Sequence, residues 1–288
     1  MRIFNKSYFN DFYCGNFDYK DNINLRIDYS NIYKDGFTVQ GFCVTSDYYL
    51  VSAYSKGCLS RVYLYKKDGV LDKYVVLDNK AHVGGITYDN VNGILYITGR
   101  YGKINCYSYN EFISGKVKVI DSDINISNDL EGHVSAATLY YYGGSLYICT
   151  CSCNGSMIKY DLKYKNNKII IVDKNIHRCL PSCIQGLVVF ECNEMLYYLI
   201  SQSYSKLKSI IKLYDYDNRF IGQKIIGFKG LEGFDMDSFG NINCIFENGV
   251  SKSVILNINE LNRNLNKRLE YKYYLKVKNH QEKLDKSK

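Results

Sequence analysis

Apolar and polar residues alternate along short stretches of this chain, and most stretches end at a cluster of glycine, asparagine, aspartate or serine. A period of two is the pattern of a β-strand that buries one face, and the polar clusters have the composition of turns. Periodicity of the helical kind is almost absent. The pattern therefore predicts an all-β protein of short strands that follow one another as antiparallel meanders.

The same order of strands recurs along the chain. The segment "VQGFCVTSDYYLVSAYSKGCLSRVYLYKKDG" from Val39 reappears as "IQGLVVFECNEMLYYLISQSYSKLKSIIKLYDYD" from Ile184, and related segments begin at His82, His133 and Leu231. Each segment starts with a small residue, and the steps between these residues are 44, 51, 50 and 47 residues, close to the length of a four-stranded propeller blade. The residues taken as equivalent are Gly41, Gly85, Ala136, Gly186 and Gly233.

A blade of this kind cannot bury both of its faces alone, so the repeats must close into one ring. We therefore predict a single domain over residues 1–288, a five-bladed β-propeller of four-stranded antiparallel meander blades that begin near residues 39, 82, 133, 184 and 231. Closure of the ring needs a strand from one terminus, either within 17–34 or within 262–288, where "RLEYKYYLKV" alternates. A pair of β-sandwiches and a six-bladed ring are the alternative architectures.

Polar residues at the start of the first strand of each blade should converge on the central channel, because these strands surround it. The residue before each small residue and the residue two positions earlier face the same side of the strand. We expect these positions to place two imidazoles, two carboxamides and one carboxylate around the channel mouth. They are Gln40, Gly84, Ser135, Gln185 and Glu232, preceded by Thr38, His82, His133, Cys183 and Gly230.

Several interpretations of this mouth stay open. Histidine and glutamate ligate divalent cations, so Glu232, His82 and His133 are candidate metal ligands, and a divalent cation is a candidate cofactor. The same residues suit acid/base catalysis, with Glu232 as the group that transfers a proton. Polar side chains could also do no more than satisfy a water-filled channel.

The second strands end in a further polar cluster, which predicts the rim of a binding pocket. Tyr54 stands between serines in the first blade, Tyr204 stands between serines in the fourth, and Arg100 lies in "TGRYGK". Tyrosine and arginine suit a polar or anionic ligand. The predicted ligand-binding residues are therefore Gln40, His82, His133, Gln185, Glu232, Tyr54, Arg100 and Tyr204.

The formal net charge of +8 lies mostly in residues 262–288, which hold nine Lys and Arg against three Asp and Glu. The remainder carries only about +2, so we expect no nucleic-acid partner and interpret 262–288 as a basic tail or as the closing strand. Eleven cysteines are an odd number and too few for a disulfide scaffold, which predicts mostly free thiols. Residues 1–16 lack the apolar run of a leader or of a membrane span, so we expect a cytoplasmic protein that does not bind membranes.

The segments "FTVQGF" and "SAYSKGCLSRVYLYKKDG" resemble the opening of plant-type glutaminyl-peptide cyclotransferases, which are five-bladed propellers of similar length. The resemblance covers about blade one and the start of blade two, and it implies a common scaffold. The catalytic glutamate of that family stands in a Gly-Glu-Gly-Leu-Thr segment, where this chain has "VGGIT" with Gly84 at the glutamate position. The chain also has no tryptophan, the residue that lines the pocket in that family.

A second resemblance concerns the last repeat. The "LEGF" segment with Glu232 is similar to the Glu-Gly that opens blades in gluconolactonase- and paraoxonase-like propellers, and this likeness implies a glutamate that binds a divalent cation.

Three functions follow as hypotheses. The first is a recognition module that binds a small polar molecule or a peptide segment at the channel mouth. The second is a propeller enzyme of the glutaminyl cyclotransferase-like or metal-assisted lactonase or hydrolase type, with Glu232, His82 and His133 as its catalytic residues. The third is a scaffold that binds a protein partner, as propellers often do.

Overall fold

The computed structural model describes residues 27–130, 132–150, 155–192, 194–203, 208–218, 220–247 and 251–255. Its first sheet is an antiparallel meander in chain order, which the alternating pattern from Val39 predicts. The strands of this sheet are β1 (Thr38–Val44), β2 (Tyr48–Tyr54), β3 (Arg61–Lys66) and β4 (Leu71–Val76).

The second sheet joins two meanders edge to edge. The first meander is β5 (Ile86–Asp89), β6 (Ile94–Thr98), β7 (Ile104–Ser108) and β8 (Val119–Ser122). The second is β9 (Thr138–Tyr142), β10 (Ser145–Cys149), β11 (Gly155–Lys165) and β12 (Lys168–Leu180). The start of β12 pairs in parallel with β8, through Lys168 opposite Asp121 and Ile169 opposite Ser122. The length of the β11–β12 hairpin makes this contact, because its tip extends past β10 to the neighbouring meander.

The remaining described strands form two further meanders. One contains β13 (Ile184–Cys192), β14 (Met195–Gln202), β15 (Lys208–Asp215) and β16 (Phe220–Lys229). The other contains β17 (Leu231–Met236), β18 (Asn241–Phe246) and β19 (Ser251–Ile255). Short helical segments lie in the connections, and they are α2 (Ser30–Lys34), α3 (Tyr109–Ile113) and the 3-10 turns η1 (Arg100–Gly102) and η2 (Val134–Ala136).

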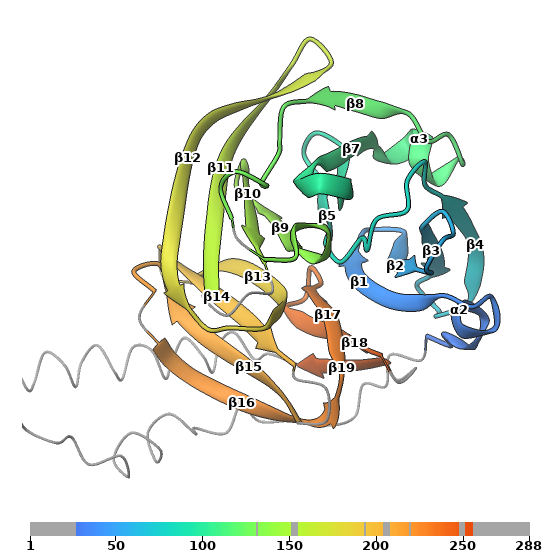
Figure 1. The fold of residues 1–288 in the computed structure, drawn as a ribbon. Helices are drawn as coiled ribbons and strands as arrows, with labels where there is room; N and C mark the ends of the chain where they lie inside the picture. Colours follow the sequence, from blue (N-terminus) through green and yellow to red (C-terminus); the bar gives the residue numbers. More distant parts are fainter. Residues whose placement is uncertain are drawn as a thin grey trace, which may run out of the picture.

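The first strands of the meanders, which we call the inner strands, form a closed ring. β1 lies beside β5, β5 beside β9, β9 beside β13, β13 beside β17, and β17 beside β1 again. Figure 1 shows these inner strands around the middle of the molecule, with β4, β8, β12 and β16 toward the outside. The fold is thus all-β and propeller-like, as the repeat predicts. The count of five four-stranded blades stays a prediction, because the last sheet is described with three strands only.

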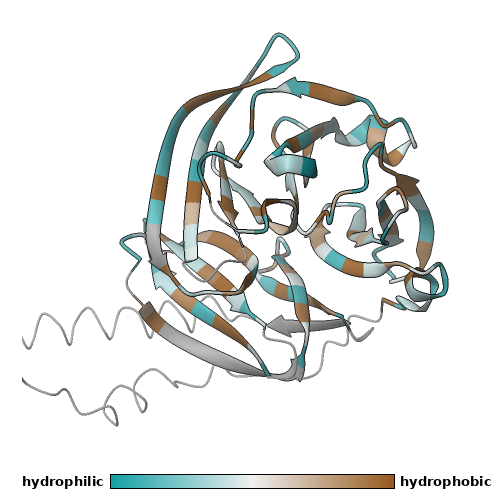
Figure 2. Ribbon diagram, in the orientation of Figure 1, coloured by the Kyte–Doolittle hydropathy of each residue, from teal (hydrophilic) through white to brown (hydrophobic). Residues whose placement is uncertain are grey.

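Buried apolar side chains fill the spaces between neighbouring sheets, and tyrosine supplies much of their volume. Tyr63, Tyr107 and Tyr198 are fully buried. Figure 2 shows hydrophobic and hydrophilic segments alternating along the long strands β11 and β12, as expected for strands with one buried face. Ile245 of β18 packs in the same cluster as Val39 of β1, so this core joins the last sheet to the first.

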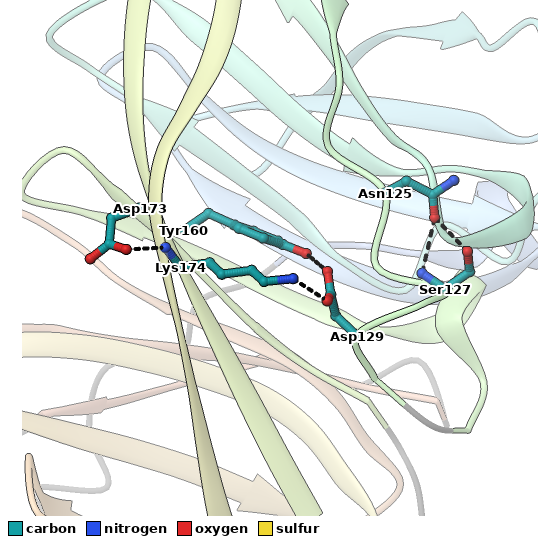
Figure 3. A network of polar contacts seen from close by, with 6 residues as sticks. All are labelled: Asn125, Ser127, Asp129, Tyr160, Asp173 and Lys174. Atoms are coloured by element: carbon teal, nitrogen blue, oxygen red, sulfur yellow. Dashed lines mark hydrogen bonds and ion pairs between the residues drawn. The ribbon is translucent and has the colours of Figure 1, made fainter.

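The connection from β8 to β9 is held against the β11–β12 hairpin by a polar network. Asp129 accepts hydrogen bonds from the Tyr160 hydroxyl and from Lys174 Nζ, both at 2.6 Å. Within the same connection, Asn125 Oδ1 accepts from the Ser127 amide at 2.9 Å and from its hydroxyl at 2.7 Å (Figure 3). These bonds hold the chain where it turns toward the inner strand β9.

The proposal of a closing strand within 17–34 is wrong for the part that the structure describes. Residues 30–34 form helix α2, which buries Ile32 and carries the chain into β1. Arg61 of β3 holds the end of this helix through a 2.6 Å ion pair with Asp35, while its guanidinium lies 4.3 Å from the centre of the Phe37 ring. Residues 17–26 and 262–288 lie outside the described residues, so the closing strand stays a prediction.

Two further expectations concern the thiols and the membrane. Cys43, Cys58, Cys106, Cys149, Cys183 and Cys244 are free thiols. Within the described ranges, no helix is long and apolar enough to span a bilayer.

Candidate functional site

Three inner strands carry the same irregularity near their first residues. In β1, β13 and β17 the pairing with the second strand skips one residue, and the skipped residue stands directly before a glycine. Such a β-bulge bends the strand and re-aims one side chain. The skipped residues are Gln40, Gln185 and Glu232, so these three residues occupy equivalent positions in their strands. We call this end of the inner strands the mouth end.

The structure brings three of the predicted site residues into direct contact. His82 Nδ1 lies 3.1 Å from Gln40 Oε1, and the His82 ring stacks on the Tyr54 ring with their centres 4.1 Å apart. All three side chains are half-buried. Gln40 comes from the bulge of β1, Tyr54 ends β2, and His82 precedes β5, so the cluster joins the first sheet to the second.

The hydrogen bonds around Gln40 determine the tautomer of His82. Gln40 Nε2 donates to the Val39 carbonyl at 2.9 Å, which leaves Oε1 as the acceptor that faces the imidazole. His82 Nδ1 must therefore carry the proton, and Nε2 keeps a lone pair. Burial, and then the nearby His133, lower the pKa of His82, so the neutral ring is favoured. The cluster presents a fixed hydrogen-bond acceptor at the mouth end.

The third repeat is shifted by two residues from the register that the sequence suggests. Two hydrogen bonds between neighbouring sheets show this, because each joins a side chain of one inner strand to an amide of the next. Asp235 Oδ2 accepts from the Val44 amide at 2.7 Å, and Thr87 Oγ1 accepts from the Tyr141 amide at 3.0 Å. The two bonds are equivalent, which makes Tyr141 the counterpart of Val44. Thr138 is then the counterpart of Gly41, in place of Ala136.

This shift changes the place of His133. Ala137 occupies the position predicted for Ser135, and Ser135 occupies the position predicted for His133. His133 itself lies two residues farther from β9 than predicted. His133 is exposed and directly precedes η2. It stays close enough to His82 to lower the pKa of that ring by charge repulsion. The expectation of two equivalent imidazoles is therefore wrong in register, although both rings lie near the mouth end.

Arg100 lies on the same side of the ring as His133. It begins η1, which contacts η2, and its guanidinium is 5.4 Å from the centre of the Tyr101 ring. Both Arg100 and Tyr101 are exposed, so they form part of an open rim. Tyr204, the remaining predicted rim residue, lies outside the described residues.

Glu232 is the acidic member of the mouth end. Its side chain is half-buried on the bulge of β17, and burial, together with the charge of Glu247, raises the pKa of Glu232 to about 8. Glu247 stands at the end of β18, where its amide donates to the Gly230 carbonyl at 2.7 Å. Glu232 is therefore protonated at neutral pH and offers a hydroxyl donor.

The carboxamide of Gln185 occupies the equivalent position on β13. Gln185 is half-buried, and a second amide stands beside its bulge, because Gln202 pairs with Ile184 and donates from Nε2 to the Ser182 carbonyl. Sequence analysis missed Gln202. What identifies Gln202 as a neighbour of the site is its position opposite the first residue of β13. This position is known only from the strand register.

Two serine hydroxyls face the small residues of the inner strands. Ser52 is paired with Gly41, and Ser201 is paired with Gly186. Ser52 Oγ donates to the Val83 carbonyl of the next repeat at 2.6 Å, which links the two sheets just below His82. Both serines belong to the Ser/Tyr clusters that were assigned to the rim, but both are fully buried. Their role is therefore structural.

Gly84 occupies the position that the cyclotransferase resemblance assigns to the catalytic glutamate. A Cβ added there would lie 2.8 Å from the Ala136 Cα and 2.9 Å from its carbonyl carbon. Real Cβ atoms do not approach a backbone this closely, so the packing of η2 excludes any side chain at this position. The local structure therefore does not fit the catalytic centre of that family.

The residues present also do not fit the divalent-cation site that the "LEGF" resemblance implies. Among the residues that the structure describes, no group of three or more His, Cys, Asp and Glu side chains could hold a metal ion. His82 Nδ1 faces Gln40 and is engaged by that contact. We therefore derive no step through a metal.

No protein-family model and no curated protein matches this chain. Solved structures with a similar fold include the WD40 β-propeller domain of Doa1, with 9% sequence identity and a TM-score of 0.44, over 82% of this chain and 96% of that chain. Another is a structural genomics protein of unknown function from Bacteroides thetaiotaomicron, with 13% identity and a TM-score of 0.49, over 74% of this chain and 57% of that chain. Our assignment of the fold rests on the strand order and on the closed ring of inner strands.

Proposed function

We propose that this protein is a propeller recognition module that binds a small polar molecule, or a polar segment of a peptide, at the mouth end. The observation that carries the proposal is the ordered contact of His82 with Gln40 and Tyr54. A ring held by a hydrogen bond on one nitrogen and by stacking on one face loses little freedom on binding, so its remaining nitrogen can select a ligand at low entropic cost.

The chemistry of the mouth end favours a ligand that is polar but neutral. His82 Nε2 accepts a hydrogen bond, while the protonated Glu232 and the Gln185 carboxamide donate. A primary or secondary amide carries both complementary groups, since it has an N–H donor and a carbonyl acceptor. Arg100 on the open rim adds attraction for a negative group at the edge of such a ligand.

The first test measures binding of a fragment set of neutral amides, carboxylates and amines by ligand-observed NMR. We expect the amides to bind, and we expect His82→Ala and Gln40→Ala to weaken their affinity at least about tenfold, because each variant removes the oriented acceptor. His177→Ala is the matched control, since His177 is a half-buried histidine on the outer strand β12. Unchanged affinity in both mouth variants, with thermal unfolding as in the wild type, would end the proposal.

A second function is favoured by Glu232 alone. A carboxyl with a pKa of about 8 is suited to general acid catalysis at neutral pH, because it is protonated yet able to release its proton. This supports a propeller enzyme of the cyclotransferase-like or hydrolase type in which Glu232, and not the residue at position 84, transfers the proton.

This second function has its own test. A screen of lactones, esters and glutaminyl peptides should reveal turnover that Glu232→Gln lowers by at least about a hundredfold, because general acid catalysis contributes roughly 10²–10⁴. Glu111→Gln is the control, as it changes an exposed carboxylate on helix α3. Turnover that survives in Glu232→Gln would show that this residue is not catalytic.

The wider organisation stays part of the proposal. We propose one domain with five blades, completed by a fourth strand beside β19 from a terminal segment, and we propose the cytoplasm as its location. The free thiols support that location, because reducing compartments preserve them. A protein partner is the third proposed class, and the propeller-like ring is compatible with it.

A further inference from the structure

The end of the ring opposite the mouth is formed by the loops that join each inner strand to its second strand. We call them the tip loops, and they span 45–47, 90–93, 143–144, 193–194 and 237–240. The inner strands run side by side in the same direction, since neighbours contact each other both near Gly41 and near Val44. The tip loops therefore gather around the other end of the channel.

Large apolar side chains project from this end into solvent. Phe239 is 87% exposed and Val91 is 82% exposed, each within a tip loop, and Met195 directly after a tip loop is 42% exposed. Covering such side chains would remove apolar area from water, and all three lie at the same end of the ring of inner strands. The tip loops thus present an apolar surface that nothing in the described residues covers.

Acidic side chains predominate on this surface, and the basic group beside them is Lys67, which interacts electrostatically with Asp47 and Asp237. The five tip loops contain no Lys or Arg. Asp47, Glu191 and Glu194 are exposed in the tip loops or beside them, and within the described part of the chain none of the three forms an ion pair. An apolar surface with acidic groups fits a segment that combines basic and apolar side chains.

The chain itself carries such a segment, and it leaves the described residues at this end. β19 runs antiparallel to β18, and its last residue, Ile255, pairs with Asn241, the residue that directly follows a tip loop. Residues 262–288 hold nine Lys and Arg against three Asp and Glu, with alternating apolar side chains from Leu269 to Val277. When extended, the seven residues between Ile255 and position 263 can span about 23–25 Å. This length is roughly twice the ~10 Å that separates packed sheets, so it is enough to reach a neighbouring tip loop.

We propose that the carboxy-terminal segment 262–288 docks on the tip loops of its own molecule, which leaves the closing strand beside β19 to the amino-terminal segment. Its basic side chains lie against Asp47, Glu191 and Glu194, and its leucine and tyrosine side chains cover Val91, Met195 and Phe239. The basic charge of the chain is then a complement to its own acidic surface. A partner protein with a similar segment, or a second copy of the chain, would have to displace this contact to bind there.

The test is zero-length carbodiimide cross-linking of the full chain, read by mass spectrometry. We expect amide cross-links from Lys276, Lys278 and Lys283 to Asp47, Glu191 or Glu194. The double variant Val91→Ser/Phe239→Ser keeps all of these carboxylates and should lower the cross-link yield at least about fivefold, because it removes the apolar part of the surface. The control Leu59→Ser/Val172→Ser removes two exposed apolar residues elsewhere and should leave the yield unchanged.

Three outcomes would overturn the proposal. Cross-links of these lysines to Glu232 or Glu247 would place the segment at the mouth end, and equal yields in both double variants would show that the apolar surface is not involved. Cross-links that join labelled to unlabelled copies in a mixed-isotope sample would show a second molecule as the occupant. Circular dichroism and thermal unfolding of each variant establish that the compared proteins are folded.

Discussion

At the residue scale, the mouth end holds two titratable groups whose pKa values shift in opposite directions. Each shift favours the uncharged form of its group. Burial lowers the pKa of His82 and raises that of Glu232 to about 8, so both are uncharged at pH 7. The hydrogen bond to Gln40 then makes His82 an acceptor, whereas the proton on Glu232 makes it a donor. A site with this combination is matched to an amide and poorly matched to an isolated ion.

The raised pKa of Glu232 predicts a specific effect on stability. Below pH 4.5 Glu232 is protonated in both the folded and the unfolded chain and makes no difference. As pH rises from about 4.5 through 8 the unfolded chain ionises first, so the folded state loses stability relative to Glu232→Gln. Chemical denaturation of both proteins at several pH values measures this difference. A difference that stays constant with pH would contradict the assigned shift.

At the scale of the element, a small residue in the inner strand β1 permits close approach to β5, and the residue opposite it on β2 makes the link to the next sheet. A Cβ at Gly41 would lie 2.6 Å from the Gly84 carbonyl oxygen, so only glycine lets these two strands approach. Ser52, opposite Gly41, then reaches the Val83 carbonyl. The bulge places Gln40 directly before this tightly packed point, where His82 can meet it.

Two equivalent serines make a matched pair for testing this arrangement. Ser52→Ala should lower the free energy of unfolding by about 1–3 kcal/mol, because it leaves the buried Val83 carbonyl without its donor. Ser201 is buried at the equivalent position opposite Gly186, and its hydroxyl finds no hydrogen-bond partner among the described residues. Ser201→Ala should therefore be neutral or slightly stabilising. Urea denaturation compares the two variants, and equal losses in both would refute the assigned role of Ser52.

At the scale of the whole molecule, the last described sheet closes onto the first. Asp235 of β17 accepts the Val44 amide of β1 at 2.7 Å, and Ile245 packs against the apolar residues of the first sheet. The closed ring gives the molecule two different ends. One carries the neutral polar cluster around His82, and the other carries the acidic and apolar tip loops with Phe239.

The strand order could be predicted from the sequence because alternation and turn residues are local signals. The pattern from Val39 predicts successive antiparallel strands, and β1 to β4 follow in that order. The register of the third repeat could not be predicted, because Ala136 satisfies the small-residue rule whereas its true counterpart, Thr138, does not. The parallel contact of β8 with β12 depends on the length of a hairpin and has no local signal either.

The site shows the same limit. Gln40, Gln185 and Glu232 were predictable because they precede a glycine in three repeats. The stacking of His82 on Tyr54 was not, since it joins the end of one strand to the connection before another. Helix α2 was mistaken for part of a strand because five residues are too few for a helical period to stand out.

The four histidines of the chain allow one direct measurement of the central claim, that the mouth end holds an oriented neutral imidazole for ligand binding. The measurement is ¹⁵N NMR of the histidine-labelled full-length protein at pH 7, before and after addition of N-acetylglutaminamide. We predict that His82 is neutral with its proton on Nδ1, and that its Nε2 resonance shifts on titration while that of His177 stays fixed. A charged His82, a proton on Nε2, or a titration that leaves His82 unmoved would contradict the account.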